Sequence, residues 1–268
     1  MQHSHRSAFT LLELAIVLTI ISFIVGTIFV GTSLLQSSKL QSVMNDVENY
    51  KSSIKLFKEK YKELPGDFTG ATAFWGAADN DAGNCPNVAG TGTQTCNGNG
   101  NGVIGYYDPS GTTPLSSAQE EPLLLWQHLT NSGMLDGAYP GATVAVNLVP
   151  GTNIPPSKVD GAGYYVRYAL PGSATGVFNA DYYHVIMLGL PYNDETPPLT
   201  PALKPNDAYE LDQKMDDSKP GTGKVLSFTN ATNVYGQTPA CATGTSSSAE
   251  YNINVESIEC AMIFITGF

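Results

Sequence analysis

The sequence predicts an α+β fold, in which one long N-terminal helix packs against a mostly antiparallel sheet. Residues 9–64 contain no proline and are predicted to form a single helix. Its first half is apolar on all sides, and its second half is apolar on one side only. From residue 142 onward, short runs rich in Val, Ile and Tyr are bounded by Gly and Pro, which is typical of β-strands. Strands joined by loops and one or two helices favour an antiparallel sheet laid on the long helix. The length of 268 residues suits one helical anchor with one sizeable globular domain or two small ones.

The first half of the helix is long enough to span a membrane. No charged residue occurs from Leu14 to Ser38, and about 20 apolar residues cross a hydrocarbon core. Pro65-Gly66 ends the helix, because proline disfavours helical backbone in the preceding residue. A helix over residues 9–64 is roughly 80 Å long. In its second half, apolar residues recur in steps of three and four and mark one face: Leu40, Val43, Met44, Val47, Tyr50, Ile54, Phe57, Tyr61 and Leu64.

Glu13 stands at the start of the apolar run. A carboxylate in the middle of a bilayer costs roughly 2.5–3.5 kcal/mol on insertion scales. An ordinary anchor gains nothing from such a residue. A positive partner inside the membrane would neutralise it, so Glu13 predicts an interaction there.

Around Glu13, the sequence resembles the type IV pilin and pseudopilin superfamily, the subunits of type IV pili and type II secretion filaments. The residues that carry the resemblance are Ala8, Phe9-Thr10-Leu11-Leu12-Glu13-Leu14 and the apolar run behind them. It implies that a peptidase cuts between Ala8 and Phe9 and methylates the new amine. It also implies that Glu13 then pairs with the Phe9 amine of a neighbouring subunit. The family usually has Gly before the cut, where this chain has Ala8, a difference that would slow processing rather than prevent it.

The resemblance also implies domains, partners and a location. Residues 1–8 are the leader, residues 9–64 the long helix, with 9–35 as its membrane or filament-core half, and residues 65–268 the pilin-like head. The implied partners are other copies and other pilins in a helical filament, the prepilin peptidase and methyltransferase, the inner-membrane assembly platform and membrane lipid. The chain would cross the inner membrane once, with Arg6 in the cytoplasm and the head in the periplasm. It would then enter a periplasmic or extracellular filament.

Two other interpretations of the N-terminal stretch are a secretory signal peptide and an ordinary single-pass anchor. A signal peptide has an apolar core of roughly 7–15 residues followed by a cut site. In this chain the apolar run is longer, the cut site implied by the resemblance precedes it, and an acid stands at its start. These differences favour the prepilin interpretation.

The charge of the chain is unevenly distributed. From Asp67 onward there are 6 basic and 19 acidic residues, and without Arg6 the mature chain has 12 basic against 24 acidic residues, a net charge of −12. An acidic head argues against nucleic acid as a partner, because phosphate binding needs a basic patch. The four cysteines lie beyond the anchor, on the side where disulfides persist. They allow three pairings, of which closeness in sequence favours Cys85–Cys96 with Cys241–Cys260.

The head is predicted to contain helices and strands in mixed order. Residues 65–116 form an irregular segment that Phe68, Phe74 and Trp75 pin onto the long helix. A capping box of Ser117 and Glu120 opens a helix, and a second short helix covers Asn206–Asp217. The predicted strands are Ala142–Val149, Gly163–Leu170, Tyr182–Leu190, Lys224–Phe228 and Cys260–Thr266, the last of them central because it is the most apolar.

Calcium is the candidate cofactor, and no other is expected. Asn97, Asn99, Asn101 and Asp108 stand at the first, third, fifth and twelfth positions of a loop with Gly102 at the sixth. This is the ligand spacing of a calcium-binding loop. The alternative is a run of Asn/Gly turns, since these residues adopt positive φ at little cost.

The other clusters have structural alternatives too. The acidic cluster over Asp212–Asp217 is either a solvated helix end or a metal site. The second half of the predicted long helix has a face of lysines, which is either solvated or docked against acidic neighbouring heads. His128 and His184 are expected to be structural, since no nucleophile or second His stands at motif spacing. Three Tyr pairs suit strand packing, with sugar or surface binding as the alternative: Tyr106-Tyr107, Tyr164-Tyr165 and Tyr182-Tyr183. The members of the lysine face are Lys51, Lys55, Lys58 and Lys62.

The sequence therefore favours a structural function. The predicted protein is a filament subunit that polymerises through its N-terminal helix, and it is a substrate of the processing peptidase rather than an enzyme. No G-x-S-x-G, H-E-x-x-H or P-loop motif occurs. A minor pilin that acts as tip adhesin or ligand-binding head is the second hypothesis, and a membrane-anchored protein of unrelated function is the third.

Overall fold

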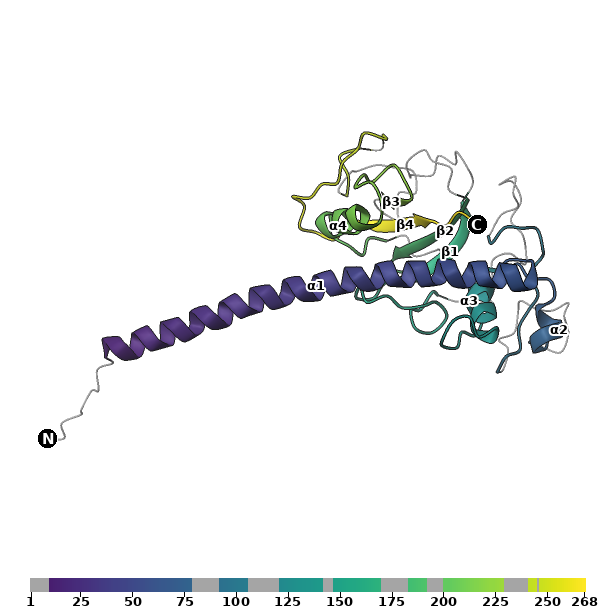
Figure 1. Cartoon of the computed structure of the whole chain (residues 1–268), viewed down its shortest axis with the longest axis horizontal. Helices are drawn as coiled ribbons and strands as arrows, with labels where there is room; N and C mark the ends of the chain where they lie inside the picture. Colours follow the sequence, from purple (N-terminus) through teal and green to yellow (C-terminus); the bar gives the residue numbers. More distant parts are fainter. Residues whose placement is uncertain are drawn as a thin grey trace.

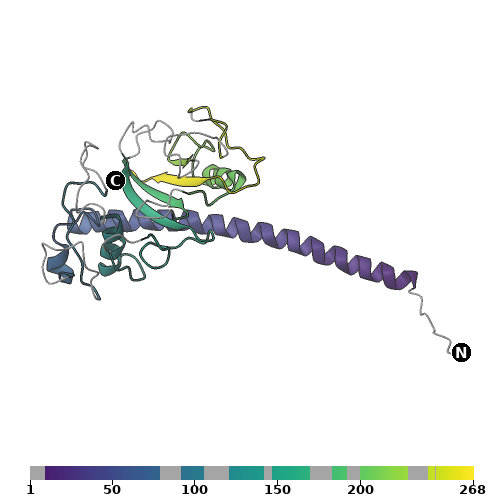
Figure 2. The ribbon, with the colours of Figure 1, turned by 180° about the vertical axis from the view of Figure 1, so that it is seen from behind.

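A long helix runs through one side of the molecule and projects far beyond the head (Figure 1). The computed structural model describes residues 10–78, 92–105, 121–141, 147–169, 183–191, 200–228, 241–244 and 246–268. The long helix is α1 (Leu11–Tyr61), whose C-terminal half lies against the head while its N-terminal half is bare. The view from behind shows the same division (Figure 2). The predicted α+β architecture is confirmed.

Both ends of α1 have a local cause. Thr10 is its N-cap, with extended backbone and a side chain that accepts the N–H of Glu13. At the other end, Lys62 takes a left-handed conformation with a φ of 66°. This residue stops the helix shortly before Pro65-Gly66, so α1 ends three residues earlier than the predicted Leu64. The predicted first residue, Phe9, lies outside the described residues.

The predicted apolar face of α1 is the face that the head covers. Its side chains are buried from residue 40 onward in steps of three and four: Leu40, Val43, Val47, Tyr50, Ile54 and Phe57. Burying each such side chain stabilises the fold by roughly 1.5–3 kcal/mol relative to leaving it exposed. The second half of α1 is therefore part of the head's hydrophobic core, which holds the helix and the head in one unit.

The sheet of the head is fully antiparallel. Its strands are β1 (Gly163–Ala169), β2 (Tyr183–Gly189), β3 (Val225–Phe228) and β4 (Ala261–Ile265), in the order β1-β2-β4-β3. β4 lies inside the sheet and is almost wholly buried, as its apolar sequence predicted. Tyr164 of β1 joins the sheet to α1, because its hydroxyl donates to Asp46 at 3.0 Å and its ring packs edge-on against Tyr50.

One predicted strand is wrong where the structure describes it. Residues 142–146 of the expected strand Ala142–Val149 lie outside the described residues, and residues 147–149 are in no strand. Asn153 explains the difference. Its side chain accepts the N–H of Val149 at 2.7 Å and donates to the carbonyl of Asn147 at 3.0 Å. The polar groups that a sheet ladder would use are thus taken up by a local turn.

The remaining helices pack around the C-terminal half of α1. α3 (Glu121–Asn131) buries Trp126 edge-on against Tyr50, and α4 (Pro205–Met215) contacts α1 and β3. α4 starts at a proline, which suits the first turn of a helix, and ends two residues before the predicted Asp217. The predicted capping box of Ser117 and Glu120 lies outside the described residues.

A short helix, α2 (Ala71–Trp75), was not predicted within the irregular segment. It carries two of the three aromatic residues that were expected to pin this segment onto α1. Phe68 lies 5.8 Å from Phe57 and Phe74 lies 5.4 Å from Tyr61, both measured between ring centroids. Trp75 contacts the same two α1 residues. The predicted pinning is confirmed.

Candidate functional site

The N-terminal half of α1 presents apolar side chains to its surroundings on every side. Leu11 is 88% exposed, Phe23 is 73% exposed and Leu34 is 66% exposed. Among the described residues, α1 is the one helix long and apolar enough to cross a membrane. So much exposed apolar surface is unfavourable in water, so this half of the helix needs lipid or other protein around it.

The few hydroxyl groups in this half are compatible with an apolar environment. Thr19, Ser22 and Thr27 each donate a hydrogen bond of 2.8 Å to a carbonyl three or four residues earlier in the helix. A hydroxyl that is satisfied inside its own helix does not need water. Glu13 is the one acidic residue in the apolar half of α1, and its charge cannot be satisfied in this way.

Glu13 folds back onto the start of its own helix. One carboxylate oxygen accepts the backbone N–H of Thr10 at 2.8 Å and the hydroxyl of Thr10 at 2.9 Å, while the N–H of Glu13 donates to that hydroxyl oxygen at 3.2 Å. This is a reciprocal capping box. It also places the negative charge at the positive end of the helix dipole. The carboxylate therefore points toward the chain segment that precedes α1.

The predicted processing residues lie just beyond this cap. Ala8 and Phe9 are outside the described residues, whereas Thr10 is the residue immediately after Phe9. The structure thus places the Glu13 carboxylate against the backbone of a residue adjacent to the predicted new N-terminus. A carboxylate in this position can accept hydrogen bonds from its own chain start or from an ammonium group brought by another molecule.

Comparison with known families identifies this stretch. Residues 3–29 match the model of the prokaryotic N-terminal methylation motif. The motif is the hallmark of type IV prepilins and pseudopilins, and in this N-terminal stretch the chain is similar to those proteins. No curated protein and no solved structure matches the chain in the corresponding comparisons.

The predicted calcium loop is organised by two carboxylates that the sequence analysis did not single out. Asp67 accepts the N–H groups of Asn101 at 3.0 Å and Gly102 at 2.9 Å. Glu121 accepts those of Asn99 and Gly105, each at 3.3 Å. Both acids are buried. The loop thus turns its backbone N–H groups toward a pair of buried acids.

The three asparagines of the loop also use their side-chain oxygens inside the protein. Asn97 accepts the N–H of Thr72, Asn99 that of Asn101, and Asn101 that of Val103. These contacts are those of the Asn/Gly turn alternative. The fourth expected ligand, Asp108, lies outside the described residues, so the calcium hypothesis stays a prediction.

Burial and repulsion from neighbouring acids change the pKa of each of the two carboxylates. Burial raises the pKa of Glu121 to about 8, and the neighbouring Asp67 charge adds to this, against the opposing N–H groups of Asn99 and Gly105. Burial likewise raises the pKa of Asp67. No signal in the local sequence distinguishes these acids from solvated ones, because the segments that bury them are remote in the chain.

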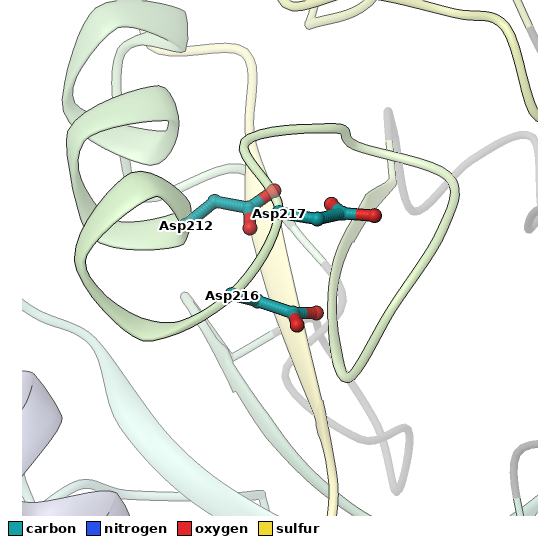
Figure 3. Close-up of side chains that lie close together, drawn as sticks. All are labelled: Asp212, Asp216 and Asp217. Atoms are coloured by element: carbon teal, nitrogen blue, oxygen red, sulfur yellow. The ribbon is translucent and has the colours of Figure 1, made fainter.

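The acidic cluster at the end of α4 brings Asp212, Asp216 and Asp217 together, with one oxygen from each within 4.8 Å of the others (Figure 3). Every carboxylate already accepts hydrogen bonds from the protein. Asp212 accepts from Ser218 and Tyr251, and burial raises its pKa to about 7. Asp216 accepts from the N–H groups of Lys224 and Val225, and Asp217 from Lys219 and Thr222. The cluster closes the turn between α4 and β3.

The two buried histidines bridge segments of the head. His128 accepts the N–H of Gly66 at 2.9 Å, so its other ring nitrogen donates to the carbonyl of Cys96 at 3.0 Å. His184 accepts the N–H of Ile104 at 3.2 Å and donates to the carbonyl of Phe268 at 3.1 Å. Burial lowers the pKa of each to about 4. Both rings are therefore neutral connectors, as the sequence predicted.

The disulfides and tyrosine pairs are only partly within the described residues. Cys241 and Cys260 are joined, which ties the segment after β3 to the start of β4. Cys96 is also disulfide-bonded, and its predicted partner Cys85 lies outside the described residues. Tyr164 and Tyr165 are buried packing residues and Tyr183 is half exposed. The other paired tyrosines, Tyr106, Tyr107 and Tyr182, lie outside the described residues.

Proposed function

We propose that the protein is a structural subunit of a type IV pilus or a type II secretion-like filament. A prepilin peptidase cuts it before Phe9 and methylates the new amine, and the mature chain polymerises through the N-terminal half of α1. The observation that carries this proposal is the bare apolar half-helix with a single acid at its start. A helix bundle covers such a surface, and the acid supplies one charged contact inside it.

Lipid and neighbouring helices are nearly equivalent surroundings for the apolar side chains, because hydrocarbon is as apolar as Leu. The charge on Glu13 distinguishes the two. In lipid, the carboxylate costs a few kcal/mol unless it is paired. In a filament core, it pairs with the methylated Phe9 amine of the next subunit, and the pair sets the axial step between subunits. Until then, membrane lipid and the inner-membrane assembly platform hold the subunit with its head in the periplasm.

Nothing in this proposal requires catalysis by the head. The buried histidines are neutral and hydrogen-bonded to the backbone, and the carboxylates around the Asn/Gly loop hold backbone N–H groups. These groups are used to fix the fold of the described residues. The head is the part displayed on the filament surface.

The first test is the mature N-terminus. Mass spectrometry of the native protein is expected to find N-methylated Phe9 as the first residue. Ala8→Gly should speed cleavage or leave it unchanged, whereas Ala8→Trp should block it. A native chain that begins at Met1, or within residues 20–40, would contradict the proposal.

The second test is assembly. Glu13→Ala should abolish filaments while the cleaved subunit still accumulates in the membrane, since the helix remains apolar. Thr10→Val is the matched control, because it removes the hydroxyl of the same capping box and keeps the carboxylate. Electron microscopy of purified filaments with subunit stoichiometry reads out the result and separates a main subunit from a tip subunit. Filaments formed normally by Glu13→Ala would overturn the assembly role.

A further inference from the structure

The outer face of α1 carries a basic groove in an otherwise acidic head. The groove has a volume of about 640 Å³ and lies between the exposed face of α1 and the C-terminal residues Thr266–Phe268. Four lysines line it at steps of four, three and four, which places them on one helical face: Lys51, Lys55, Lys58 and Lys62. We call it the lysine groove.

Most of the positive charge in the lysine groove is uncompensated. Lys51 pairs with Glu48 at 3.0 Å. Lys55, Lys58 and Lys62 are exposed and form no ion pair with any described residue. Two acids, Glu48 and Glu59, also line the groove, so its four lysines leave a net charge of 4 − 2 = +2. The groove therefore offers positive charge to a partner.

The opposite end of the head has the complementary character. The segment of residues 253–259, which we call the acidic loop, presents Glu256, Glu259 and two exposed isoleucines, Ile253 and Ile258. Glu256 is 85% exposed along its side chain and, among the described residues, pairs with Lys204, the residue before α4. Such an exposed pair contributes little and is easily exchanged.

The two features are far apart within one molecule. Asp207 of α4 bonds to Gln36 of α1, so α4 and the acidic loop lie at the level of residues 36–40. The lysine groove lies at the level of residues 51–62. At 1.5 Å per residue, the axial separation is roughly 30 Å. Figures 1 and 2 both show α4 near the bare half of α1 and the C-terminus farther along the head.

We infer that the lysine groove of one copy receives the acidic loop of a second copy displaced along the helix axis. The inference rests on the proposed filament function. Opposite charges meet in this arrangement, because Lys55 and Lys58 face Glu256 and Glu259. Because Glu13 and Phe9 are four residues apart, about 6 Å along a helix, this second copy is not the one whose amine Glu13 reaches. The groove contact would tie together heads that are several steps apart in the filament.

A zero-length cross-linker tests this contact directly in assembled native filaments. Carbodiimide joins a lysine amine to a carboxylate only when the two groups touch. Peptide mapping is expected to find Lys55 or Lys58 joined to Glu256 or Glu259. Because these groups lie roughly 30 Å apart within one copy, such a product can only form between copies. Filaments in which neither Lys55 nor Lys58 joins Glu256 or Glu259 overturn the inference while the proposed function stands.

Charge reversal gives an independent test. Lys55→Glu with Lys58→Glu should lower filament yield about fivefold or more, since two attractive contacts become repulsive. Adding Glu256→Lys with Glu259→Lys should restore most of the yield. The matched control is Lys214→Glu with Lys219→Glu, which makes the same change of net charge at exposed lysines outside the groove. Equal losses in the groove and control variants, or no restoration, overturn the inference. Absence of filaments from the native chain overturns the proposed function, and the inference with it.

Discussion

Glu121 makes the stability of the head depend on pH in a way that ordinary surface acids do not. Burial raises its pKa from the usual 4.5 to about 8. The folded protein therefore binds a proton that the unfolded chain has already lost between these pH values. The contribution to the free energy of unfolding is fully present below pH 4.5 and is lost as the pH rises through about 8. Over the whole window it amounts to about 5 kcal/mol.

The buried histidines oppose this trend in the lower part of the window. The pKa of His128 and of His184 is lowered from 6.5 to about 4, so both lose stability as the pH falls below 6.5. Asp67 and Asp212 also have raised pKa values. Asp212 is half-titrated near pH 7, and the stability that it loses between pH 6.5 and 8.5 is about what the two histidines together regain. Above pH 7, Glu121 contributes the largest remaining change. Between pH 6.5 and 8.5 we expect the free energy of unfolding to fall by about 2 kcal/mol.

The perturbation that isolates Glu121 is Glu121→Gln. The amide resembles the protonated acid in size and does not ionise. Its NH₂ group cannot accept the second of the two N–H groups that Glu121 holds, so the variant should be less stable overall but lack the pH slope. The variant should be nearly flat between pH 6.5 and 8.5, where the native chain loses about 4–8 °C in melting temperature. Thermal melts of the full chain in detergent micelles measure both slopes.

A matched control uses a glutamate that is open to water. Glu256→Gln removes a carboxylate whose side chain is 85% exposed, so it should leave the pH slope of the native chain unchanged. If Glu121→Gln keeps the native slope, the buried carboxylate is not its origin. A native chain that is equally stable at pH 6.5 and 8.5 would refute the reasoning outright.

Two further predictions concern the disulfide and the calcium hypothesis. Replacing Cys241 and Cys260 together by Ser should lower the free energy of unfolding by about 2–4 kcal/mol, because the disulfide closes a loop that ends at the start of a central strand. Urea unfolding with and without reductant measures this loss. An unchanged unfolding midpoint would contradict the prediction. On the calcium hypothesis, Asn97, Asn99, Asn101 and Asp108 bind calcium with a dissociation constant of roughly 10⁻⁴–10⁻³ M. Millimolar calcium should then raise the melting temperature of the native chain but not that of Asp108→Ala. If the melting temperature of the native chain is the same with calcium and with chelator, the loop is only a set of turns.

Local sequence patterns predicted the elements that depend on local causes. The helix α1 follows from an uninterrupted apolar period, and its buried face from steps of three and four. β4 follows from its apolar run. The segment Asn147–Val149 had the composition of a strand, yet a single side chain, Asn153, competes for its backbone groups. Composition cannot reveal this competition.

The acids of the head were harder to predict, because burial is a property of the folded chain. Asp67 follows the Pro65-Gly66 helix stop and looks like an ordinary turn residue. The groups that donate to its carboxylate, such as the N–H of Asn101, lie in a loop more than 30 residues later in the chain. Gly98 permits that approach, because a Cβ there would overlap the backbone of Asp67. Only the tertiary structure brings these groups together.

The division of α1 between a bare half and a covered half decides which interactions can drive assembly. Leu34 and Leu35 are exposed, whereas Leu40 is fully buried, so the head ends within one or two turns of the apolar half. On our proposal, transfer from lipid to a filament then requires no refolding of the head. Because lipid and neighbouring helices are nearly equivalent for apolar side chains, the apolar surface cannot by itself favour the filament. The polar contacts must do so, and on our proposals these are Glu13 at the start of α1 and the lysine groove at its end.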